Sequence, residues 1–119
     1  VKGYITGAKL FNQLGLTTQV PNVINIVTNE CTNCNEYKNE KLGVIIRKPK
    51  IKINNENYRY LQLLDIINNK DHVNIEVDNE DQILYDFIEK NKLDFEKIIK
   101  YARETKSRKI LEKLYVIAR

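Results

Sequence analysis

The chain has 119 residues, of which 42% are hydrophobic and 30% are charged. These proportions are typical of a globular domain, and no apolar run approaches the roughly 20 residues that a membrane-spanning helix needs. A basic start followed by an apolar core, which would indicate secretion, is also missing, so we expect a cytoplasmic protein that does not bind membranes. We interpret the absence of methionine, including at position 1, as the sign of an excised fragment.

The net charge of +4 is unevenly distributed along the chain. Residues 71–89 contain seven acidic residues and neither lysine nor arginine, whereas residues 90–119 contain ten basic residues and four acidic ones. A basic carboxy-terminal third can attract nucleic acid or an acidic protein surface. The alternative is that these basic side chains are the solvated sides of amphipathic helices.

The first predicted element is a short helix that follows Thr6, whose hydroxyl can accept a hydrogen bond from an amide of the first turn. Its apolar face consists of Leu10, Phe11 and Leu14. Gly15 stands where a left-handed residue closes a helix, and Leu16 is placed to contact Phe11 in a Schellman motif. The sequence therefore predicts a defined end for this helix.

Three β-type segments follow the helix. Residues 22–28 (NVINIVT) are apolar on both faces, which is typical of a central strand, and Pro21 marks its start because proline cannot donate to a sheet. Residues 42–48 form the second predicted strand. Residues 50–53 alternate lysine and isoleucine, as a half-exposed strand does. The polar residues 29–41 between the first two strands are predicted to be a long hairpin loop.

The remainder of the chain is predicted to be mostly helical. Residues 58–67 have a wide apolar face, so we expect this helix to pack on the sheet. Residues 73–77 alternate apolar and polar side chains, which fits a short edge strand or an extended linker. Three more helices are predicted to begin at Asp78, Asp94 and Ser107.

These elements indicate an α+β fold in which an amino-terminal helix precedes a small, mainly antiparallel sheet of three or four strands, with the carboxy-terminal helices packed on or beside it. We expect a single domain over residues 1–119, made of a helix and sheet part (1–77) and a helical part (78–119).

Residues with catalytic or metal-binding potential are few. Cys31 and Cys34 have the spacing of a zinc or redox pair, but a structural zinc site needs four ligands and the chain has only two cysteines and His72. We interpret the two cysteines as incidental loop residues and predict no metal site and no cofactor. His72 lacks the partners of a catalytic triad, and the predicted strands carry no acidic residues for a metal-dependent nuclease. No phosphate-binding glycine loop is present either, so we predict that the protein is not an enzyme.

The run GAKLFNQLGLTTQVPN, residues 7–22, resembles the region that follows the DNA-binding part of AbiEi-type antitoxins, which belong to abortive-infection (type IV) toxin–antitoxin systems. Residues 43–49, followed by 58–67, resemble the next block of that family, and residues 93–114 resemble its closing helices more loosely. The residues of the central motif are Gly7, Leu14, Gly15, Leu16, Thr17, Thr18, Gln19 and Pro21.

The resemblance implies a transcriptional regulator of phage defence. Its amino-terminal winged helix binds operator DNA, and its following α+β domain counters a cognate nucleotidyltransferase toxin. This chain is similar to the second domain alone, so we expect the winged helix upstream of Val1. The toxin is countered either by direct contact or through its product. The Thr-Thr-Gln link has two alternative roles, joining helix to strand or contacting the partner.

If contact with the toxin is direct, the candidate surfaces are the acidic helix over residues 79–90 and the basic residues that follow it. The basic candidates are Lys97, Lys100, Arg103, Lys106, Arg108 and Lys109. The alternative function is that of a nucleic-acid-binding accessory domain, in which these side chains bind phosphates without sequence preference.

Overall fold

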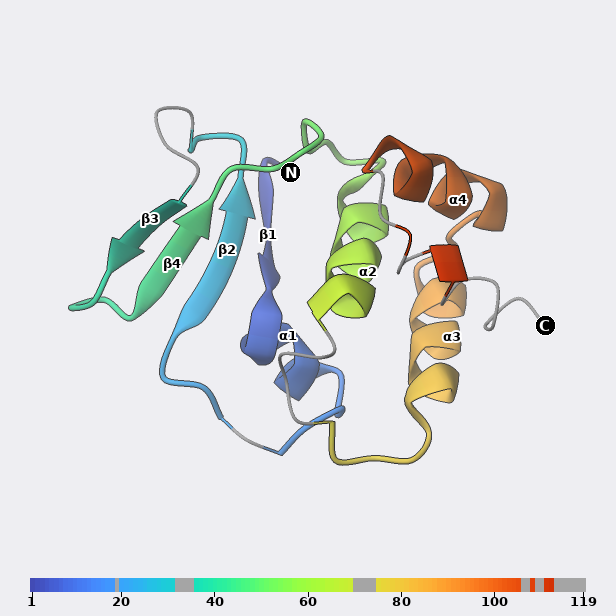
Figure 1. Ribbon diagram of the computed structural model, residues 1–119, viewed down its shortest axis with the longest axis horizontal. Coiled ribbons are helices and arrows are strands. Elements are labelled where there is room, and N and C mark those ends of the chain that lie inside the picture. Colours follow the sequence, from blue (N-terminus) through green and yellow to red (C-terminus); the bar gives the residue numbers. More distant parts are fainter. Residues whose placement is uncertain (19, 32–35, 70–74, 106–107, 109–110, 113–119) are drawn as a thin grey trace.

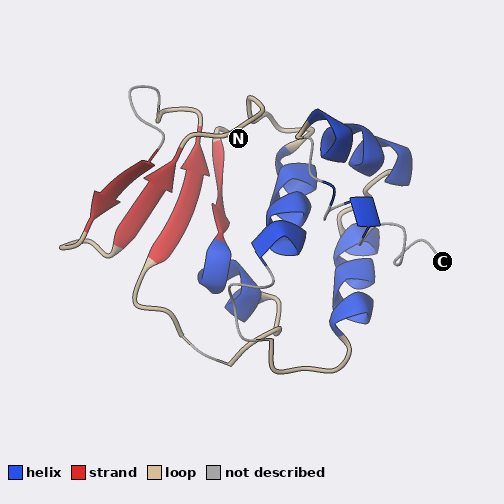
Figure 2. Ribbon diagram, viewed as in Figure 1, coloured by secondary structure: helices blue, strands red, loops and turns tan. Residues whose placement is uncertain are grey.

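The computed structural model describes residues 1–18, 20–31, 36–69, 75–105, 108 and 111–112. In chain order the elements are β1 (Gly3–Thr6), α1 (Gly7–Gln13), β2 (Ile24–Thr28), β3 (Glu36–Asn39), β4 (Val44–Arg47), α2 (Tyr58–Asn69), α3 (Glu80–Lys90) and α4 (Phe95–Glu104). The predicted α+β fold is therefore confirmed. The helices gather on the β1 side of the sheet, and β3 forms its far edge (Figures 1 and 2).

The sheet has the strand order β1-β2-β4-β3. β1 pairs antiparallel with β2, β2 pairs parallel with β4, and β3 pairs antiparallel with β4. Two of the three pairings are antiparallel, as predicted, but the interpretation of residues 29–41 as a simple hairpin loop is wrong. That segment contains β3, which pairs on the outer side of β4. β2 and β4 therefore run in the same direction.

β2 lies inside the sheet, which agrees with the expectation of a central strand. Only Val27 of this strand is fully buried, at 1% exposure, and the other β2 residues are half-buried. The free edge of β1 is in contact with α2, because the buried Gln62 side chain donates from Nε2 to the main-chain oxygen of Ile5 at 2.9 Å. α2 is thus fixed directly to the first strand.

The passage from β1 to α1 requires a glycine. Gly7 has φ +71°, which favours glycine, and a Cβ at this position would lie 2.8 Å from Nδ2 of Asn25. Thr6 occupies the N-cap position, but its side chain makes no capping hydrogen bond, so the predicted role of its hydroxyl is wrong. The residues of β1 were not predicted to form a strand.

The end of α1 is the predicted Schellman motif. Gly15 has φ +80°, the amide of Leu16 donates to the oxygen of Phe11 at 3.0 Å, and the amide of Gly15 donates to the oxygen of Asn12 at 3.1 Å. Phe11 and Leu16 are 0% and 1% exposed. The apolar contact that accompanies this motif is therefore in the core.

Residues 50–53 do not form the predicted strand. The side chain of Asn29 takes the place of a neighbouring strand: its Oδ1 accepts from the amide of Ile53 and its Nδ2 donates to the oxygen of Ile53, both at 2.8 Å. Ile53 is buried, whereas Lys50 and Lys52 are exposed. The alternation of lysine and isoleucine therefore reflects the exposed and the buried side of a segment that does not pair with a strand of the sheet.

The predicted helices agree with the structure in most respects. α2 begins at Tyr58 as predicted, and the side chain of Asp94 caps α4 by accepting from the amide of Glu96 at 2.9 Å. The start predicted for α3 is wrong, because Asn79, not Asp78, precedes its first turn and makes no side-chain cap.

Two predicted segments are only partly described. Residues 75–77 are an extended linker, and Ile75 and Val77 pack against the main core. Of the helix predicted from Ser107, only Arg108, Leu111 and Glu112 are described, and all three are helical.

The main core lies between the helices. It joins the buried faces of four helices and Leu16: Leu10, Phe11, Leu16, Tyr60, Leu63, Leu64, Ile66, Ile67, Leu84, Phe87, Ile88, Ile98 and Ala102. A smaller cluster of Val27, Ile53 and Leu61, with Tyr4 packed against it, connects the sheet to α2. These two clusters hold the sheet and the helices in fixed positions relative to each other.

Candidate interaction surfaces

The link between α1 and β2 (residues 16–21) is fixed by Glu76. The Thr17 and Thr18 hydroxyls donate to Oε2 of Glu76 at 2.9 and 2.8 Å, and the Thr18 amide donates to the same oxygen. In return, the Glu76 amide donates to the main-chain oxygen of Leu16 at 2.9 Å. The Thr18 amide and then the two hydroxyls hold the pKa of the Glu76 carboxyl below its usual range.

Both threonines of the motif therefore hold the link to Glu76. Thr17 is only 3% exposed, whereas Thr18 is exposed and Val20 is 75% exposed. Pro21 is half-buried, and Gln19 lies outside the described residues. Glu76 was not among the predicted site residues. Glu76 lies in a segment in which apolar and polar residues alternate, and this pattern does not indicate a contact with the link.

The basic candidates of α4 lie on its exposed side. Lys97, Lys100 and Arg103 are exposed, while Ile98 and Ala102 of the same helix are fully buried. The structure thus brings three of the six predicted basic residues onto one helix.

The other basic candidates follow α4 in the chain. Arg108 is exposed and lies 3.6 Å from the Glu112 carboxylate, so it is part of an ion pair. Lys106 and Lys109 lie outside the described residues.

The predicted acidic helix is α3. Asp81, Asp86 and Glu89 are exposed, and the opposite side of the helix is buried in the main core. Tyr85 stands between these acids at 46% exposure, and its hydrogen bond to Glu89 raises the pKa of its hydroxyl. α3 and α4 are consecutive and pack into the same core, so the acidic residues of α3 and the three basic residues of α4 lie on neighbouring helices (Figure 1). The exposed residues of α4 also include Glu96 and Glu104.

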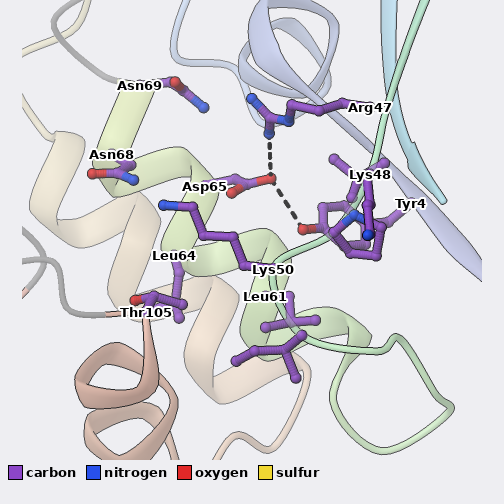
Figure 3. A pocket seen from close by; sticks show the side chains of 13 residues that line it. Tyr4, Arg47, Lys48, Lys50, Leu61, Leu64, Asp65, Asn68, Asn69 and Thr105 are labelled. Carbon is purple, nitrogen blue, oxygen red and sulfur yellow. Dashed lines mark hydrogen bonds and ion pairs between the residues drawn. The ribbon is translucent and has the colours of Figure 1, made fainter. Parts of the chain in front are cut away.

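A third group of polar residues was missed by sequence reasoning. Asp65 of α2 accepts a hydrogen bond from the Tyr4 hydroxyl at 3.1 Å, and its Oδ2 lies 3.3 Å from Nη2 of Arg47 (Figure 3). Tyr4 comes from β1 and Arg47 from the end of β4. The one available signal was that Asp65 is the only acidic residue of α2, in the middle of its apolar residues.

Burial dominates the electrostatics of this group. The side chain of Asp65 is 19% exposed, and burial raises its pKa more than Arg47 and the Tyr4 hydroxyl lower it. Burial, and then the nearby Asp65 carboxylate, raises the pKa of Tyr4. The three side chains line a pocket of about 150 Å³, which we call the Asp65 pocket. Its rim includes Lys48, Lys50, Asn68, Asn69 and Thr105.

Within the described part of the chain, no three histidine, cysteine or acidic side chains are grouped as metal ligands are. Cys31 is buried, and Cys34 and His72 lie outside the described residues. Among the described helices, none has the length and apolar character required to cross a membrane.

Comparison with known proteins gave no match: no family model, no curated protein and no solved structure corresponds to this chain.

Proposed function

We propose that this chain is a non-catalytic interaction domain of an AbiEi-like antitoxin and that it counters a nucleotidyltransferase toxin. The observation that carries the proposal is the conformation of the segment that resembles this family. Gly7 and Gly15 have positive φ angles, and Thr17 and Thr18 bind Glu76. Four residues of the motif are therefore of the types that the two ends of α1 and the link after it need, which supports the resemblance in fold.

The distribution of charge supports a macromolecular partner. The acidic side of α3 and the basic side of α4 are exposed on neighbouring helices, and complementary charge on a protein surface steers and orients a partner. Of the two, we propose that the basic surface of α4, defined by Lys97, Lys100 and Arg103, contacts the toxin.

The test is rescue of growth in cells that express the nucleotidyltransferase toxin encoded beside the parent gene. We expect the triple variant Lys97→Glu, Lys100→Glu and Arg103→Glu to abolish rescue and copurification with the toxin. Its circular dichroism melt should remain unchanged, because all three side chains are exposed.

The matched control is a triple variant of Lys2, Lys38 and Lys41 to glutamate, which makes the same change of charge at other exposed positions and should still rescue growth. Full rescue by the α4 variant would dismiss its basic surface. The acidic surface is then tested with Asp86→Lys and Glu89→Lys, and full rescue by this variant as well overturns the proposal of direct contact through either helix.

The alternative function is that of a nucleic-acid-binding accessory domain that uses the basic carboxy-terminal helices. A titration of the chain with fluorescent duplex DNA distinguishes toxin binding from this function. Absence of binding at low salt eliminates it, because phosphate contacts are strongest under that condition.

A further inference from the structure

We propose that the Asp65 pocket binds a phosphate group. The proposal does not depend on the function proposed above, because it concerns a different part of the molecule and a different ligand. It starts from the charges around the pocket. Arg47, Lys48 and Lys50 supply three positive charges, and Asp65 supplies the one carboxylate among the lining residues.

The carboxylate is already satisfied. Its Oδ2 accepts from the Tyr4 hydroxyl and is paired with the Arg47 guanidinium. No described carboxylate forms an ion pair with Lys48 or Lys50. Lys50 does act on Asp65, because its charge lowers the pKa of that carboxyl. The lining nevertheless carries three positive charges against one negative charge, and an excess of positive charge around a pocket favours an anion.

The pocket also offers a neutral hydrogen-bond donor. Asn69, at the end of α2, contributes a side-chain amide, whereas the Thr105 hydroxyl, which lines the pocket as well, already donates to the main-chain oxygen of Ala102 at 2.9 Å. Figure 3 shows Lys50 extending across the pocket on the side of Asp65 and Asn68. Amide and ammonium donors that line one space match the acceptor oxygens of a phosphate, which can bind several donors at once.

The backbone that carries the lysines is fixed at both ends. On one side, Arg47 is the last residue of β4. On the other side, Ile53 is bound to the Asn29 side chain through two hydrogen bonds of 2.8 Å, and Nδ2 of Asn57 donates to the oxygen of Lys52 at 2.8 Å. A site that is held in place before the ligand arrives binds it with a smaller loss of conformational entropy.

The pocket is large enough for a phosphate group. Its volume is about 150 Å³, several times the roughly 10–15 Å³ that one water molecule needs by the same measure. The phosphate can belong to a free nucleotide or to a nucleic-acid strand, and both sources present the same oxygens to the pocket.

The first experiment is an NMR titration of the ¹⁵N-labelled chain with inorganic phosphate. We expect saturable shifts of the Asp65, Asn68, Asn69 and Thr105 signals at concentrations on the order of millimolar. The double variant Lys48→Gln and Lys50→Gln should bind about tenfold more weakly, because it removes two positive charges from the lining of the pocket. The matched control, Lys97→Gln and Lys100→Gln, removes the same charge from α4 and should change the affinity by less than about twofold.

The source of the phosphate is distinguished by two further ligands, a nucleoside 5′-monophosphate and an oligonucleotide that lacks terminal phosphates. Binding of the first alone assigns the pocket to phosphate monoesters. Binding of the second, with an affinity that falls steeply as salt rises, assigns it to a nucleic-acid backbone. No saturable shift with any of the three ligands overturns the proposal, as does an equal loss of affinity in the pocket variant and the α4 control.

The outcome is separable from that of toxin rescue. If the α4 variant loses rescue but still binds phosphate, the phosphate proposal stands. If the wild-type chain rescues growth but shows no shift with phosphate, only the phosphate proposal is refuted.

Discussion

Replacing Tyr4 with phenylalanine tests whether its hydroxyl stabilises the ionised Asp65 carboxylate. The two groups lie 3.1 Å apart, and the Asp65 side chain is 19% exposed. A hydrogen bond to a charged group contributes roughly 1.5–3 kcal/mol. Because Nη2 of Arg47 remains 3.3 Å from the same oxygen, we expect Tyr4→Phe to lower the free energy of unfolding by about 1.5 kcal/mol, the lower end of that range.

The effect should depend on pH in a definite direction. Burial raises the folded-state pKa of Asp65, so the folded state loses stability as the pH rises through the window between the unfolded-state and folded-state pKa values. The Tyr4 hydroxyl opposes this rise, and its removal raises the folded-state pKa of Asp65 further. The destabilisation by Tyr4→Phe should therefore be largest above the folded-state pKa. It should shrink as the pH falls toward the unfolded-state value of about 3.9.

The assay is urea denaturation at about pH 8 and at about pH 3.5, the second of which is below the unfolded-state pKa. Tyr37→Phe is the matched control, because Tyr37 of β3 is 51% exposed and a surface change of this kind stays within about 0.5 kcal/mol. The reasoning is refuted if Tyr4→Phe has no effect at the higher pH, or if it destabilises the protein equally at both.

Three further changes test local features of the fold. Lys92 has φ +54° at the end of α3, so Lys92→Gly should raise the free energy of unfolding by about 1 kcal/mol. The control Lys90→Gly, within the helix, should lower it by roughly 0.5–1 kcal/mol, and a loss in both variants would contradict this reading. Because the hydrogen bonds from the link lower the pKa of Glu76, Glu76→Gln should be less stable than the wild type at neutral pH. That difference should vanish in urea denaturation once the pH falls below the folded-state pKa, and a difference that persists in acid would point to another cause. Ile98 is fully buried and Ile99 only partly, so Ile98→Ala should cost about 2–5 kcal/mol in thermal unfolding and Ile99→Ala clearly less; equal losses would show that the two side chains are packed alike.

The parts of the fold that were predicted correctly depend on neighbouring residues. The Schellman end of α1 follows from Gly15 and Leu16, and the cap of α4 follows from Asp94. α2 is indicated by apolar residues at helical spacing over a continuous segment. In each case a few adjacent side chains contain the whole physical reason for the structure.

The parts that were missed depend on residues far apart in the chain. β3 consists of polar residues, EYKN, and becomes a strand only because β4 offers it a free edge. The strand expected at residues 50–53 is replaced by hydrogen bonds to Asn29, 24 positions before Ile53. The Asp65 pocket joins Tyr4 to a residue 61 positions later. No local pattern encodes such contacts, because they exist only after the sheet and α2 have packed together.

The bond from Gln62 to the carbonyl of Ile5 makes the two borders of the sheet unequal. A chain that adds to a sheet needs a row of unoccupied main-chain groups, and on β1 one of them is already taken by a buried amide. On the opposite border, Glu36, Tyr37 and Lys38 are exposed. Addition of a further strand is therefore less favourable at β1 than at β3.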